Sequence, residues 1–177
     1  MTQPLVSIII LNYNAGQILL DCFESVIKTN YDNFEIIIVD NASEDKSYRK
    51  CKEKFERTRI IENGKNLGYC EGNNIGIKNA KGEFVVILNP DTTVEPCWLN
   101  ELFSAYNKYG EALYQPKHLS LKEKSIIMST GNMMNVFGFG YAREKGKKDV
   151  NQHDVIEQIG YASGTCLFVP ISVFDKV

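Results

Sequence analysis

The sequence predicts an α/β fold with a mostly parallel sheet, and two observations support this prediction. Three runs rich in β-branched residues, at positions 6–11, 34–39 and 84–88, are almost continuously apolar, as expected of strands that are covered on both faces. A stretch with helical spacing follows each run, which is the order of a βαβ repeat. The expected architecture is therefore a Rossmann-like three-layer αβα sandwich.

The first half of the chain gives these elements in order. Residues 17–28 place apolar side chains at helical spacing, in a stripe expected to lie against the sheet. That stripe comprises Ile18, Leu19, Cys22, Phe23, Val26 and Ile27. Ser43 or Asp45 is expected to cap a second helix that runs to about Phe55, and residues 59–61 indicate a short strand.

Two further helices and several short strands follow. Residues 72–80 indicate a helix that begins among glycines and asparagines, where free backbone N–H groups can accept an anion. Glu95 and Pro96 open another helix, because the N–H that proline lacks is not needed in a first turn, and Gly110 closes it. Its expected buried stripe is Trp98, Leu99, Leu102, Phe103 and Tyr106. Later strands are expected at residues 112–115, 125–129 and 166–169.

Length and composition narrow the class of protein. The 177 residues fit one domain that can bury roughly 70% of its unfolded surface without disulfides. A net charge of −2 gives no general attraction to nucleic acid or to an anionic membrane. The five cysteines include no C-x-x-C pair, which favours reduced thiols in a cytoplasmic protein. Residues 1–4 carry no basic leader, and no apolar run approaches the ~18 residues that span a bilayer.

Polar residues follow three of the predicted strands at the point where each strand ends. They are Asn12-Tyr13-Asn14, Asp40-Asn41-Ala42-Ser43 and Asn89-Pro90-Asp91. Ligands of open α/β sheets gather at the carboxyl ends of the strands. Asp91, with the amide of Asn89 two residues earlier, offers hard oxygen ligands for Mg²⁺ or Mn²⁺. Because a single carboxylate fills only part of the coordination shell of a divalent cation, phosphate groups of a ligand are expected to supply further oxygen ligands.

This order of motifs resembles the family 2 glycosyltransferases of the GT-A fold, and within them the rhamnosyltransferase-like branch, whose metal motif is often Asn-x-Asp. The resemblance covers nearly the whole chain, through residues 6–14, 37–43, 66–68, 72–76, 88–92 and 163–169. It implies a nucleotide-diphosphate sugar of the UDP, dTDP or GDP type as donor. It also implies a glycan or lipid-linked acceptor, inverting transfer and a role in cell-surface polysaccharide synthesis.

The resemblance also implies roles for individual residues. Leu11 and Tyr13 would pack against the nucleotide base, and Asp40 would accept a hydrogen bond from that base. Asp91 would ligate Mg²⁺ or Mn²⁺, with Asn89 as a neutral or water-mediated ligand. The full expected donor-binding set is Leu11, Tyr13, Asn14, Asp40, Asn41, Gly72, Asn74, Asn89 and Asp91. Without the family match, Tyr13 could be a core ring and Asp40 a helix cap.

Gly72 and Asn74 would lie by the sugar and phosphates, where a missing side chain allows close backbone approach. Members of the family usually continue, after a segment like residues 163–177, with a Gly-Gly-Phe-Asp-Glu stretch and an acidic pair that carries the general base. No residue here matches that base, so no catalytic residue is assigned.

The expected organisation is one domain, 1–177, truncated at the carboxyl end. Residues 1–110 would form the donor nucleotide-binding half and residues 111–177 the start of the acceptor half. The resemblance allows a homodimer, and it allows peripheral association with the inner face of the membrane through a region beyond Val177.

Other classes of protein fit less well. Gly138-Phe139-Gly140 is half of a dinucleotide-binding fingerprint, but no third glycine follows. A nucleotidyltransferase would need basic residues in the loop after the first strand, and residues 12–16 have none. A non-catalytic sugar-nucleotide-binding module or subunit stays open as the alternative, because the base is missing. Residues 145–148 fit a solvated basic loop, and His118 and His153 are isolated.

Overall fold

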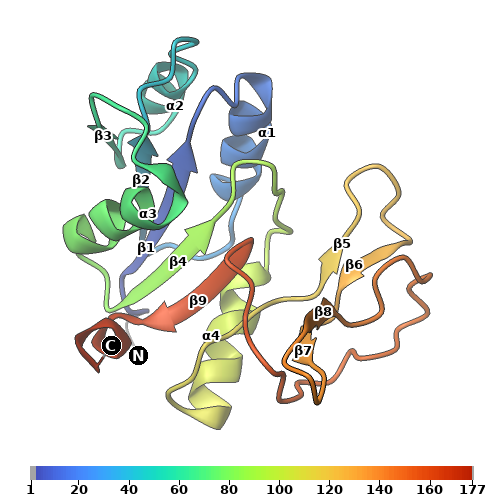
Figure 1. Cartoon of the computed structure of the whole chain (residues 1–177). Coiled ribbons are helices and arrows are strands. Elements are labelled where there is room, and N and C mark those ends of the chain that lie inside the picture. The colour runs from blue at the N-terminus through green and yellow to red at the C-terminus, as the bar shows by residue number, and fades with distance from the viewer. Residues whose placement is uncertain (1–2, 177) are drawn as a thin grey trace.

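The computed structural model describes residues 3–176. Residues 1, 2 and 177, which bear on the expectations about a leader and about truncation, lie outside the described residues. The central sheet has the strand order β3-β2-β1-β4-β9 (Figure 1). Its strands are β1 (Val6–Asn12), β2 (Phe34–Asp40), β3 (Thr58–Glu62), β4 (Phe84–Leu88) and β9 (Cys166–Pro170). The first four are parallel, and β9 runs antiparallel beside β4.

Helices cover both faces of this sheet, which confirms the predicted three-layer fold (Figure 1). On one face lie α1 (Gln17–Val26), α2 (Tyr48–Lys54) and α4 (Trp98–Tyr109). On the other lie α3 (Gly68–Asn79) and the 3₁₀ helix η1 (Ile171–Lys176). Successive side chains of a strand point to opposite faces, so Ile8 and Ile10 pack in the first layer and Ile9 in the second. Burial on both faces explains why these strands are continuously apolar.

The expected boundaries of several helices are wrong. α2 begins at Tyr48 with Ser47 at the N-cap and no side-chain cap bond; Ser43 accepts from Asn14, and Asp45 accepts from Gly16 and Ser47, so neither caps the first turn of the helix. α3 begins at Gly68, four residues before the expected start, so Gly72 lies inside the helix.

Two details of the helical faces and ends also differ from expectation. Ile18 is 52% exposed, whereas the rest of the α1 stripe is buried or partly buried, because Ile18 falls at the edge of the buried arc in the first turn. α4 begins at Trp98 rather than Glu95, but it ends as expected at Gly110, whose φ of 81° suits glycine.

The second half is built from short pairs of strands. β5 (His118–Leu119) pairs with β6 (Ile127–Ser129), and β7 (Asn132–Met134) pairs with β8 (Gly140–Ala142). The strand expected at 112–115 is absent, since Tyr114 makes only a single bridge to Phe168. Gly138 has a φ of 83° in the loop between β7 and β8, so the Gly-Phe-Gly sequence belongs to a hairpin and not to a nucleotide-binding turn.

The chain then returns to the first half through β9, which forms the edge of the central sheet beside β4. One sheet therefore contains residues from both sides of position 110. Within residues 3–176, no helix has the length and apolar character needed to cross a membrane.

Candidate functional site

The carboxyl ends of β1, β2 and β4 meet at one edge of the sheet. β1 pairs with β2 on one side and with β4 on the other, so the strand order reverses at β1. A reversal of this kind leaves a crevice outside the strand ends, where α/β proteins bind ligands. The register places Asn12 directly opposite Asp40. The three polar segments predicted from the sequence thus lie at this edge.

The loops that follow β1 and β2 are joined by a compact set of hydrogen bonds. The side-chain amide of Asn12 donates to Oδ1 of Asp40 at 2.7 Å and to Oγ of Ser43 at 2.9 Å. The backbone N–H of Asn14 donates to the same Ser43 oxygen at 2.9 Å. The N–H of Ser43 donates to Oδ2 of Asp40 at 2.9 Å. Both carboxylate oxygens of Asp40 are therefore held by donors from the protein.

A second set of hydrogen bonds joins the same two loops closer to the helices α1 and α2. The N–H of Glu44 donates to Oδ1 of Asn14 at 2.8 Å, and the N–H of Gly16 donates to Oδ2 of Asp45 at 2.8 Å. The N–H of Ser47 donates to the other Asp45 oxygen at 2.8 Å. Burial of Asp45 opposes ionisation, but the hydrogen bonds from Ser47 and Gly16 outweigh it and hold the pKa of the Asp45 carboxyl below its usual range.

The predicted base-contact residues differ in exposure. Tyr13 is 53% exposed and is therefore not a core ring, whereas Asp40 is 2% exposed. Leu11 packs over Gly72, where an added Cβ would lie 2.4 Å from Leu11 Cδ1. The missing side chain of Gly72 thus gives room to Leu11. Asn74 lies exposed in the second turn of α3.

Asn41 is buried in a cluster of asparagines. Its side-chain amide donates to Asn66 Oδ1 at 3.2 Å and to the carbonyl of Gly68 at 3.1 Å, and its Oδ1 accepts from Asn63 at 2.8 Å. These bonds connect the end of β2 to the start of α3. The sequence did not predict this connecting role of Asn41. The available signal was the presence of Asn41, Asn63 and Asn66 at the ends of neighbouring elements.

The Asn89-Pro90-Asp91 turn is held by its backbone. The N–H of Asn89 donates to the carbonyl of Thr165 at 2.9 Å, and the carbonyl of Asn89 accepts from the N–H of Thr92 at 3.3 Å. The thiol of Cys22 also lies 3.6 Å from that carbonyl oxygen, and burial raises its pKa to about 12. Asp91 is exposed, and within residues 3–176 its carboxylate has no hydrogen bond or ion pair. It is available to a ligand.

The chemistry of this turn fits a hard divalent cation. Asp91 and Asn89 offer a carboxylate and an amide oxygen, and Mg²⁺ is commonly held by one or two carboxylates together with substrate phosphates. In the described part of the chain, no group of three or more His, Cys, Asp or Glu side chains could hold a metal alone. The chain would therefore supply only part of the coordination shell.

A segment that sequence reasoning left without a role borders the same turn. The hydroxyl of Tyr69, in the first turn of α3, donates to the carbonyl of Gly164 at 2.7 Å. The N–H of Ser163 donates to Oε1 of Gln115 at 2.7 Å. These contacts hold residues 163–165 beside Asn89 and connect the second half of the chain to the carboxyl edge of the sheet.

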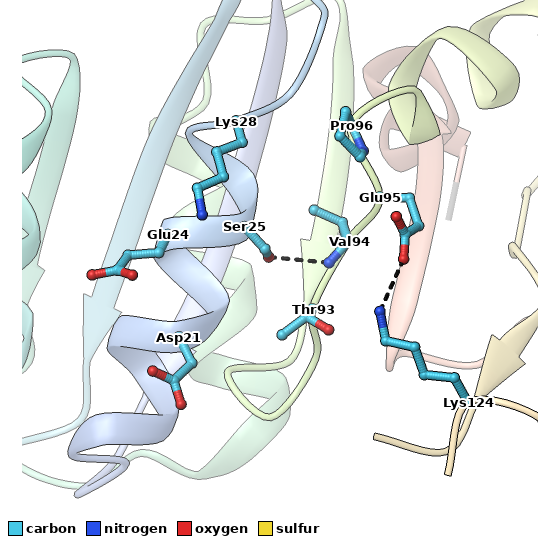
Figure 2. Close-up of a pocket in the computed structure, with 9 residues that line it drawn as sticks. All are labelled: Asp21, Glu24, Ser25, Lys28, Thr93, Val94, Glu95, Pro96 and Lys124. Atoms are coloured by element: carbon cyan, nitrogen blue, oxygen red, sulfur yellow. Dashed lines mark hydrogen bonds and ion pairs between the residues drawn. The ribbon is translucent and has the colours of Figure 1, made fainter. Parts of the chain in front are cut away.

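A separate cavity of about 310 Å³ lies between α1 and residues 93–96 (Figure 2). Within it, Ser25 Oγ accepts from the N–H of Val94 at 3.0 Å, and Lys124 pairs with Glu95 at 3.3 Å. Its lining residues are Asp21, Glu24, Ser25, Lys28, Thr93, Val94, Glu95, Pro96 and Lys124. None belongs to the predicted donor set, and carboxylates outnumber ammonium groups, which disfavours a phosphate. The candidate donor site is the strand edge rather than this cavity.

Solved structures with the same arrangement identify the fold. The mannosyltransferase PcManGT from Pyrobaculum calidifontis, in complex with GDP-Man and Mn²⁺, matches 98% of this chain and 46% of its own with a TM-score of 0.70 at 14% identity. Residues 1–349 of S. aureus TarS, in complex with UDP-GlcNAc, match 97% of this chain and 46% of that one with a TM-score of 0.66 at 15% identity. The fold is that of the GT-A glycosyltransferases.

Sequence relatives agree with this fold. The glycosyltransferase GlyG of Streptococcus pneumoniae serotype 4 is 33% identical over 136 residues, which are 75% of this chain and 40% of GlyG. This chain therefore spans less than half the length of that relative. The family model described as glycosyl transferase family 2 matches residues 7–177. The chain belongs to glycosyl transferase family 2.

Proposed function

We propose that this chain binds a nucleotide-diphosphate sugar at the carboxyl edge of its sheet and serves in inverting transfer of the sugar to a glycan or lipid-linked acceptor. One observation carries the proposal: the turns that follow the adjacent strands β1 and β4 present an exposed aromatic ring, Tyr13, and an exposed carboxylate, Asp91. A ring suits a base and a carboxylate suits the cation on a diphosphate. The GDP-Man and UDP-GlcNAc complexes of the structural neighbours support the same ligand class.

The base would lie against Tyr13, with Leu11 as the second wall. An ionised carboxylate has about four lone-pair positions, and two on Asp40 are taken by Asn12 and Ser43. The remaining positions can accept the ring N–H of uracil, thymine or guanine. Asn14 would line the same pocket from the β1 loop, and Asn41 would act by holding the start of α3.

Asp91 and Asn89 would hold Mg²⁺ or Mn²⁺. When bound, the cation neutralises charge on the departing diphosphate. Because the chain provides a single carboxylate, its metal affinity without nucleotide is expected to be weak. Gly72 and Asn74 would lie on the sugar side, and the Asn-x-Asp order supports membership of the rhamnosyltransferase-like branch of the family as part of this proposal.

In the transfer, an acceptor hydroxyl attacks the anomeric carbon opposite the leaving diphosphate, and its proton passes to a general base. No side chain among residues 3–176 is assigned that role. For this reason a non-catalytic sugar-nucleotide-binding module is the second candidate. Both candidates bind the donor, and only the first forms a glycosylated product.

Calorimetric titration with UDP, dTDP and GDP, in Mn²⁺ and then in EDTA, tests the donor site. We expect Asp91→Ala to weaken binding of the preferred nucleotide in Mn²⁺ by at least about tenfold, a loss of roughly 1.4 kcal/mol. EDTA should bring the unaltered chain to the same level. Asp32→Ala, an exposed aspartate just before β2 at the opposite edge, is the matched control and should bind normally. A folded chain that binds none of the three nucleotides would contradict the proposal.

A further inference from the structure

We infer that Ser43 is a positioning residue for base recognition, because it fixes the exposed Tyr13 ring and the buried Asp40 carboxylate in one base-binding unit. The inference rests on the proposed donor site and deepens it by naming the residue that sets its selectivity. The expected ligand is a nucleotide whose base has a ring N–H donor beside a flat π face.

The hydroxyl oxygen of Ser43 contacts both neighbours of Tyr13. It accepts from the side-chain amide of Asn12 at 2.9 Å and from the backbone N–H of Asn14 at 2.9 Å. Asn14 has a φ of 50°, a conformation that non-glycine residues adopt rarely, so the backbone turns sharply just after Tyr13. One oxygen atom therefore anchors the chain on both sides of the ring.

The same residue also orients the carboxylate. The backbone N–H of Ser43 donates to Oδ2 of Asp40 at 2.9 Å, while Asn12 donates to Oδ1 at 2.7 Å. Two donors on different oxygens prevent the carboxylate from rotating, so its remaining lone pairs keep one direction. A group that is fixed before binding loses less freedom when the ligand arrives.

The hydrogen bonds of Ser43 are not needed merely to join the loops after β1 and β2. The N–H of Gly16 already ties the β1 loop to Asp45 of the β2 loop at 2.8 Å. Tyr13 is 53% exposed, so holding its flanks buries little of the ring in the core. The bonds of Ser43 instead determine where an exposed ring and a buried carboxylate stand relative to each other.

This unit predicts selectivity among bases. Uracil, thymine and guanine have a ring N–H that a carboxylate can accept. The corresponding ring nitrogens of adenine and cytosine are acceptors and would face the negative charge unfavourably. Methylation of the ring nitrogen removes the donor and leaves the phosphates and the π face in place.

The test is the ratio of two dissociation constants in Mn²⁺, measured by calorimetry on the full 177-residue chain. One ligand is whichever of UDP, dTDP and GDP binds, and the other is its ring N-methyl analogue. We expect the unaltered chain to prefer the parent nucleotide at least about tenfold, a factor equal to roughly 1.4 kcal/mol. Ser43→Ala removes the hydroxyl bonds to Asn12 and Asn14 but keeps the backbone bond to Asp40, so it should lower this preference by freeing the flanks of Tyr13, mainly by weakening the parent nucleotide. Ser43→Thr, which keeps the hydroxyl, should restore the preference, and the exposed Ser104→Ala should not alter it.

Other outcomes would overturn the inference. If Ser43→Ala weakens both ligands equally, or leaves the ratio unchanged, Ser43 is not a positioning residue for the base. A ratio near one in the unaltered chain has the same consequence. If Ser43→Ala does not fold, Ser43→Cys keeps the volume with a weaker acceptor and gives the same comparison. Absence of any nucleotide binding by the unaltered chain would instead overturn the proposed donor site itself.

Discussion

Replacement of Ser7 by alanine should destabilise the fold without affecting the proposed donor site. Ser7 is fully buried near the amino end of β1. Its hydroxyl donates to Glu35 Oε1 at 2.7 Å and accepts from the N–H of Gly82 at 2.9 Å and from that of Lys81 at 3.2 Å. One oxygen thus connects β1, β2 and the turn before β4 at the edge opposite the proposed donor site.

The expected size of the effect follows from these contacts. Loss of a hydrogen bond to a charged group costs about 1.5–3 kcal/mol, and a buried N–H left without a partner costs about 1–3 kcal/mol. Lys81 keeps a bond to Glu35 at 2.9 Å, so its N–H adds little to the loss. We expect Ser7→Ala to lower the free energy of unfolding by about 3 kcal/mol. For a chain of this length, that corresponds to a fall in Tm of about 6–12 °C.

Urea denaturation followed by circular dichroism measures this change. Ser104→Ala, an exposed serine-to-alanine change in α4, should shift the free energy of unfolding by no more than about 0.5 kcal/mol. A loss below about 1 kcal/mol for Ser7→Ala would refute the reasoning, since the hydroxyl would then not be satisfying buried partners. Weaker nucleotide binding at a temperature where the variant is fully folded would refute the independence of the two edges.

Three further outcomes are expected. At about pH 8, a thiolate-selective reagent should label only the exposed Cys70 and Cys97 rapidly, and all five cysteines after unfolding. The reason is that burial raises the pKa to about 12 in Cys22, Cys51 and Cys166. Gly72→Ala should displace the Leu11 side chain and weaken nucleotide binding several-fold in calorimetry, while the urea midpoint changes little because alanine favours the helix. Lys117 holds the pKa of the Asp149 carboxyl below its usual range, so this pair stabilises the fold above the usual aspartate pKa and is lost as the pH falls through the lowered one. The destabilisation caused by Asp149→Asn, measured by urea titration, should therefore be present at neutral pH and disappear in acid.

The sheet could be predicted because each of its central strands has a recognisable, continuously apolar sequence. Residues that are buried on both faces must be apolar throughout, as Ile8, Ile9 and Ile10 are. The start of α3 could not be predicted in the same way. Gly68 and Gly72 are poor helix formers, yet both lie in α3, whose first turn is held by hydrogen bonds from Tyr69 to Gly164 and from Asn41 to Gly68. Tertiary packing overrides local propensity there.

For the proposed donor site, the sequence predicts which strand ends meet but not the contacts between them. The topology rules alone place Asp40 and Asp91 at one edge. The double acceptor role of Ser43 depends on two loops meeting across the sheet, and the bond from Tyr69 to Gly164 joins residues 95 positions apart. No local sequence pattern predicts such pairs, because neither residue of a pair is distinctive in its own segment.

The late return of β9 to the central sheet affects how the chain must be made. During synthesis, β4 is complete at Leu88, but its outer edge stays without a neighbour until Cys166 to Pro170 have left the ribosome. That edge exposes the sequence Phe-Val-Val-Ile-Leu with unpaired N–H and C=O groups, which invites pairing with other chains. A fragment that ends at position 110 should therefore aggregate. Expression of the proposed nucleotide-binding half alone would therefore need to include the distant strand β9, which covers the open edge of β4.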